Sequence, residues 1–159
     1  MTVPTLISAA TLTRPANTTA YSAGDVVSTL AGVLLQFYSP SRNGLIQTAR
    51  IVDGANVSPS ASFELYLFTA APAARADNAP LALTDAEAAT LVGVIPFVDT
   101  PYATNAGVGA AGNLTFAEDA TMPFALPAGP NFILYGLLVV RNAYIPVSGE
   151  TFAIQLGVS

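Results

Sequence analysis

Residues 132–140 read FILYGLLVV, an apolar run of nine residues that ends at Arg141. A short run that is apolar on both faces and rich in β-branched and aromatic types is typical of a strand covered on both sides. Residues 151–158 (TFAIQLGV) instead alternate strictly between large apolar and smaller or polar side chains. This period of two predicts a strand with one face in the core.

The same β pattern continues toward the N-terminus, with turn residues every 8–15 positions. Asn43-Gly44 predicts a hairpin, because both residues tolerate positive φ. Thr84 and Glu87 form a capping-box pattern and predict one short helix near residues 84–91. The remaining predicted strands cover residues 5–12, 25–30, 33–38, 45–52, 62–69, 91–98, 113–117 and 120–125.

About eight to ten short strands and one helix predict an all-β protein. We expect an antiparallel β-sandwich of jelly-roll type, formed as a single domain over residues 1–159. A chain of this length buries about 70% of its unfolded surface, enough for one core. Residues 1–12 are predicted as an extended N-terminal arm, and the Gly-, Ala- and Asn-rich residues 99–112 as the most flexible loop.

Four residue types are absent, since the 159 residues include no Cys, His, Trp or Lys. Without His and Cys the chain lacks the usual general base, the thiol nucleophile and the commonest transition-metal ligands. Without Lys it can form no Schiff base and no P-loop. We therefore predict that the protein is not an enzyme and holds no cofactor and no metal.

The chain carries few charges, 9% of its residues against about 25% in typical domains, and its net charge is −5. Nucleic acid binding and a polybasic membrane contact both need a cationic surface, so we expect neither partner. No apolar run reaches the length of about 20 residues that a bilayer span needs, and no secretion signal is expected at the N-terminus.

Three acidic groups are candidate sites, and in each a structural role is favoured. Glu118 and Asp119 are adjacent, and neighbours on a strand face opposite ways, which disfavours the paired carboxylates of a hydrolase. Asp85 and Glu87 lie in the first turn of the predicted helix, where they offset its dipole. Residues 53–56 (DGAN) resemble the start of a calcium loop only faintly, because the glycine is misplaced, and a turn is expected.

The charge deficit favours surface that other proteins cover. Arg forms planar ion pairs suited to interfaces, and Tyr buries area while keeping a polar hydroxyl. Two alternatives remain open: a GC-rich genome also yields Ala-rich, Lys-free proteins, and tyrosines also line sugar-binding faces. The candidate interface residues are Arg14, Tyr21, Arg42, Arg75, Tyr102, Arg141 and Tyr144.

Several segments resemble small bacteriophage virion structural proteins. They are residues 13–21 (TRPANTTAY), 23–27 (AGDVV), 63–68 (FELYLF), 77–80 (DNAP), 91–95 (LVGVI) and 134–139 (LYGLLV). The resemblance spans most of the chain and implies a capsid decoration, or cement, protein. It would be a β-sandwich on the outer shell, commonly a trimer, with no catalytic residues.

The expected function is therefore to bind the outer capsid shell and stabilise it by bridging subunits of the phage major capsid protein. Binding only the assembled shell stabilises it by mass action. This implies a homotrimer located in the virion, on the capsid surface, and made in the host bacterial cytoplasm. The alternative is a tail or head-fibre adhesin domain that binds a cell-surface glycan, and the third hypothesis is a carboxylate-dependent hydrolase.

Overall fold

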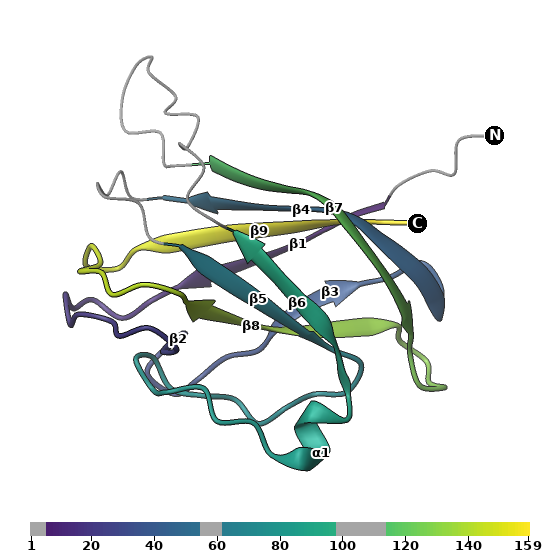
Figure 1. Ribbon diagram of the computed structural model, residues 1–159, viewed down its shortest axis with the longest axis horizontal. Coiled ribbons are helices and arrows are strands. Elements are labelled where there is room, and N and C mark those ends of the chain that lie inside the picture. Colours follow the sequence, from purple (N-terminus) through teal and green to yellow (C-terminus); the bar gives the residue numbers. More distant parts are fainter. Residues whose placement is uncertain (1–5, 55–61, 98–113) are drawn as a thin grey trace.

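Two antiparallel β-sheets pack face to face in the computed structural model of the protein (Figure 1), which describes residues 6–54, 62–97 and 114–159. This confirms the predicted β-sandwich. The first sheet has the order β1 (Leu6–Thr13), β9 (Thr151–Val158), β4 (Asn43–Asp53), β7 (Leu114–Ala125). The second has the order β2 (Val26–Val27), β8 (Ile133–Val140), β5 (Phe63–Phe68), β6 (Leu91–Phe97), and β3 (Leu35–Tyr38) also pairs with β8.

The strand order is that of a jelly roll. Strands β2 and β3 pair with successive parts of β8, since Val26 lies opposite Val139 and Leu35 lies opposite Gly136. They therefore act as one interrupted strand along the same edge. Counted in this way, the chain has eight strand positions in two sheets ordered 1-8-3-6 and 2-7-4-5, which is the jelly-roll arrangement of two Greek keys.

The core lies between the two sheets and follows the predicted alternation. Strand β9 places Phe152, Ile154 and Leu156 in the core, and none of them is exposed to solvent. The ring of Phe152 meets that of Phe63 from β5 edge to face, with centroids 5.2 Å apart. Burial of this many apolar side chains is the main force that holds the sheets together.

Strand β8 is buried on both faces, as its sequence predicts. Leu134, Leu138 and Val140 join the core between the sheets. Leu137 and Val139 face the other way and form a second apolar cluster with Val26 and Phe68. Leu81, Leu83 and Leu91 pack against this cluster. Residues between β5 and β6 therefore cover part of the outer face of the second sheet.

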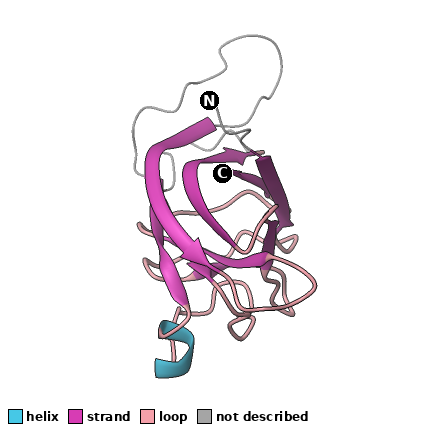
Figure 2. Cartoon of the chain, turned by 90° about the vertical axis from the view of Figure 1, so that its right-hand side faces the viewer, coloured by secondary structure: helices cyan, strands magenta, loops and turns pink. Residues whose placement is uncertain are grey.

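The helix α1 (Asp85–Ala88) is one turn long and lies beyond the end of the strands (Figure 2). Thr84 caps it, and both bonds of the predicted capping box with Glu87 are present. Within the described parts of the chain, no helix has the length and apolar character that a membrane crossing requires.

Three details differ from the sequence-based expectations. Asn43-Gly44 does not form a hairpin, because β3 and β4 belong to different sheets and the chain crosses between them. The strands predicted at residues 113–117 and 120–125 form one strand, β7. Residues 6–12 do not extend away as the predicted arm, because they lie in β1, where a strand was also predicted, and pair with β9 along its whole length. Residues 1–5 and the predicted loop at 99–112 lie outside the described residues.

One end of the sandwich carries two connections that matter for the site. They are residues 14–25, between β1 and β2, and residues 141–150, between β8 and β9 (Figure 1). The helix α1 and the β7–β8 connection lie toward the opposite end.

Candidate functional site

A buried arginine joins the two connections at this end. Arg14 directly follows β1, and its side chain is fully buried. Its Nε donates to the hydroxyl of Tyr21 at 2.9 Å, and its Nη1 donates to the carbonyls of Asn17 at 2.8 Å and Val147 at 3.0 Å. Its Nη2 forms an ion pair with Asp77 Oδ2 at 3.3 Å. One side chain thus ties together three segments that are distant in sequence.

Tyr21 and Asp77 complete this arrangement. The Tyr21 hydroxyl donates to Asp77 Oδ1, which also accepts the backbone N–H of Ser28 at 3.0 Å. Burial, followed by the bond to Asp77, raises the pKa of Tyr21. Burial alone would lower the pKa of Arg14, but Tyr21 and Asp77 outweigh it and raise that pKa. The tyrosine therefore stays neutral and the arginine stays charged over the ordinary pH range.

Tyr144 extends the arrangement toward a pair of buried carboxyl groups. Its ring stacks on that of Tyr21 at 5.2 Å, and its hydroxyl donates to Glu150 Oε2 at 3.3 Å. Glu150 in turn contacts Asp53 at the end of β4, and both residues are 3% exposed. Burial, followed by the neighbouring Asp53, raises the pKa of Glu150 to about 8. Glu150 therefore holds its proton at neutral pH.

We call Arg14, Tyr21, Asp77, Tyr144 and Glu150 the loop clasp. Backbone hydrogen bonds reinforce it, from Arg14 N to the Glu150 carbonyl and from Tyr21 N to the Tyr144 carbonyl, both 3.0 Å long. Most of its polar groups contact one another inside the protein. The clasp therefore positions the loops that it joins.

The loop clasp joins two segments that are far apart in sequence. Residues 13–21 supply Arg14 and Tyr21, and residues 77–80 supply Asp77. The segments meet through the Arg14–Asp77 ion pair. They therefore support one end of the sandwich from inside.

The loop held by the clasp exposes large apolar side chains. Ile145 is 67% exposed and Val147 is 49% exposed, although their neighbours Tyr144 and Pro146 are buried. Neither residue is among the candidates expected from the sequence. The available signal was an apolar stretch, residues 144–147 (YIPV), placed in a connection where polar residues are usual.

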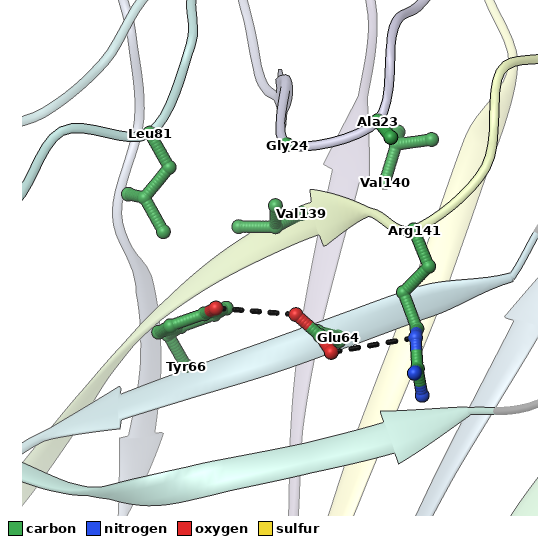
Figure 3. Close-up of a pocket in the computed structure, with 8 residues that line it drawn as sticks. All are labelled: Ala23, Gly24, Glu64, Tyr66, Leu81, Val139, Val140 and Arg141. Carbon is green, nitrogen blue, oxygen red and sulfur yellow. Dashed lines mark hydrogen bonds and ion pairs between the residues drawn. The ribbon is translucent and has the colours of Figure 1, made fainter.

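A hollow of about 450 Å³ lies on the outer face of the second sheet (Figure 3). Glu64 at its wall accepts a hydrogen bond from the Tyr66 hydroxyl at 3.1 Å and pairs with Arg141 Nε at 3.3 Å. Burial, followed by the charge of Glu64, raises the pKa of Tyr66. The other lining residues are Ala23, Gly24, Leu81, Val139 and Val140.

The remaining candidate interface residues lie elsewhere. Arg75 pairs with both carboxylate oxygens of Glu87, at 3.0 and 2.9 Å, and so links the β5–β6 connection to the helix cap. This ion pair, followed by backbone N–H bonds, lowers the pKa of Glu87 to about 2. Arg42 is exposed and donates to the Leu126 carbonyl at 2.7 Å. Tyr102 lies outside the described residues.

The seven candidates are therefore not gathered into one surface. Arg14, Tyr21 and Tyr144 are buried in the loop clasp, and Arg141 borders the hollow. Asp53, considered for a calcium loop, is buried beside Glu150. In the described part of the chain, no three acidic residues come together to hold a metal ion. The side chains of Glu118 and Asp119 are not among those described.

Comparison with known proteins adds no relative: no protein-family model and no curated protein matches this chain.

Proposed function

We propose that this protein is a bacteriophage capsid decoration protein that docks on the major capsid protein through the loop at residues 141–150. The observation that carries the proposal is the exposure of Ile145 and Val147 on a loop whose base is fixed by the loop clasp. Apolar side chains held rigidly lose little conformational entropy on binding, so each contributes strongly to affinity.

The surroundings of these side chains support an assembly role. The loop's acidic residue, Glu150, is turned inward, and the exposed residues beside the apolar pair are uncharged. Interface centres are depleted in charge in the same way. The jelly-roll fold and the low charge of the whole chain fit a protein that acts by contact, and a homotrimer on the shell would repeat the contact three times.

The test is cosedimentation of the purified protein with empty phage shells. We expect wild type to bind and to raise the temperature at which the shells rupture. The double variant Ile145→Ser, Val147→Ser should lose binding while its own unfolding temperature stays unchanged.

Leu30→Ser is the matched control, because Leu30 is 78% exposed and lies on a different loop. It should bind as wild type does. Equal binding by all three proteins, or no binding by wild type, would overturn the proposal. Light scattering of the free and the shell-bound protein separately tests the proposed trimer.

A further inference from the structure

The hollow on the outer face of the second sheet forms where the cover of that face stops. Phe68, Leu137 and Val139 are buried under the residues between β5 and β6, whereas Glu64, nearer the start of β5, is not. The volume of about 450 Å³ lies within the range of about 300–1,000 Å³ typical of small-molecule sites.

Glu64 is held in one orientation at the wall of the hollow, as Figure 3 shows. Tyr66 donates to one carboxylate oxygen and Arg141 pairs with the other. Each oxygen has two lone pairs, so one acceptor position on each oxygen remains after these contacts. The side chains of Glu64 and Arg141 stay 26% and 38% exposed, so a ligand can reach both.

The chemistry of the wall selects a neutral ligand. Glu64 and Arg141 form an ion pair, so the wall has no unpaired charge to hold an ionic ligand. Neighbouring hydroxyl groups can donate to the two Glu64 oxygens and accept from the guanidinium. Leu81 and Val139 add apolar surface, and the Tyr66 ring lies beside them. A molecule with hydroxyl edges and C–H faces fits this combination.

We propose that the hollow between Glu64, Tyr66, Leu81 and Arg141 binds a neutral pyranose sugar, with Glu64 as the main hydrogen-bond acceptor. This site shares Arg141 with the start of the loop at residues 141–150, but Ile145 and Val147, which are proposed to contact the shell, do not line it. Failure of one proposal therefore leaves the other standing.

The experiment is a titration of the ¹⁵N-labelled protein followed by NMR. The probes are methyl α-D-glucopyranoside, methyl β-D-galactopyranoside and methyl N-acetyl-β-D-glucosaminide, each at millimolar concentrations. We expect at least one of them to give saturable shifts centred on the amides of Gly24, Tyr66, Leu81 and Arg141. Glucuronate, which carries a charge, should bind more weakly than the neutral probe that binds.

Glu64→Gln keeps the shape of the side chain and removes its charge, so it should weaken binding about tenfold, the effect expected for losing a hydrogen bond to a charged group. Tyr66→Phe should weaken it less, since it only frees Glu64 to move. Tyr38→Phe, on an exposed tyrosine of β3, is the matched control and should bind as wild type.

The proposal is overturned if none of the three neutral glycosides gives saturable shifts at the hollow. It is equally overturned if Glu64→Gln binds as tightly as wild type, or if glucuronate binds best.

Discussion

Glu150→Gln is expected to remove most of the pH dependence of stability between about pH 5 and pH 8. Glu150 and Asp53 are buried in contact, and Tyr144 donates a hydrogen bond to Glu150. Two buried carboxylates in contact repel each other strongly, so Glu150 retains its proton in the folded protein. Glutamine keeps the size of the side chain and supplies an N–H donor, without a group that titrates.

The sign of the effect follows from where the proton is held. Glu150 titrates near 4.5 in the unfolded chain, whereas burial and Asp53 raise its pKa in the folded protein to about 8. Between these values the folded state binds more protons than the unfolded state. The free energy of unfolding therefore falls as the pH rises from about 4.5 to about 8.

The magnitude has a clear upper limit. A pKa difference from 4.5 to about 8 is worth at most about 5 kcal/mol, at about 1.4 kcal/mol for each pH unit. Arg14 lies close enough to favour the ionised form of Glu150. Structural relaxation gives even buried sites an effective dielectric constant of about 20, which weakens the repulsion. We expect a loss of about 2 kcal/mol between pH 5 and pH 8.

Few other side chains of the protein change their charge between pH 5 and pH 8. The sequence has no His and no Cys, the side chains that usually titrate between pH 5 and pH 9. Glu87, whose pKa is lowered to about 2, changes stability only at lower pH, between about 2 and 4.5. Among the described residues, the Asp53–Glu150 pair is therefore the expected source of a slope from pH 5 to pH 8.

The assay is urea unfolding at several pH values, followed by circular dichroism or tyrosine fluorescence. Wild type should lose stability as the pH rises, whereas Glu150→Gln should stay level and exceed wild type at pH 8. Asp85→Asn, on the exposed helix, is the control and should follow wild type. Parallel curves for wild type and Glu150→Gln, or a wild type that gains stability toward pH 8, would refute the reasoning.

Three further substitutions or titrations test other parts of the structure. Arg14→Ala should lower the free energy of unfolding by about 3–5 kcal/mol in urea, because it leaves Asp77 and Tyr21 buried without their charged partner. A loss below about 1 kcal/mol would contradict the role of the loop clasp. Gly32→Ala should cost about 1–3 kcal/mol, since φ is +80° and the new Cβ would lie 2.8 Å from the Arg75 carbonyl oxygen. Gly24→Ala is the control, because Gly24 also has a positive φ, +94°, but open space around the position of the Cβ, and it should lose less stability. Equal losses of stability in the two variants would show that the contact with Arg75 is not the cause. In a ¹³C NMR titration the Glu87 carboxylate should stay ionised down to about pH 2, and a midpoint near 4.5 would show that its ion pair does not persist in solution.

The strands that the sequence predicted best are those with the strongest burial. Residues 151–158 form β9 with unchanged bounds, because every second side chain lies in the core. Asn43-Gly44 misled the prediction of a hairpin, since its local turn preference yields to long-range pairing of β4 with β7 and β9. The sheet to which a short strand belongs depends on partners that local sequence does not reveal.

The candidate site was predicted less well than the fold, for a related reason. Arg14 and Tyr144 were chosen because Arg and Tyr suit interfaces, but the same planar donors and rings also suit buried networks inside one chain. Asp77 is 63 residues from Arg14 in sequence, and Glu150 lies still farther from its partner Asp53. Composition identified useful residue types, whereas only the folded chain shows which of them meet.

The few charged residues of the chain join separate segments through ion pairs. In the described parts of the chain, Arg14, Arg75 and Arg141 each pair with a carboxylate on a different segment. Arg14 anchors the loop that exposes Ile145 and Val147, and Arg75 joins the β5–β6 connection to the helix cap. Arg141 orients Glu64 in the hollow. Charged side chains thus fix the loops in place, and Ile145 and Val147 are left exposed on the 141–150 loop. A protein that binds through preformed loops gains from this arrangement. Its loops lose their conformational entropy during folding, so little more is lost when they bind a partner.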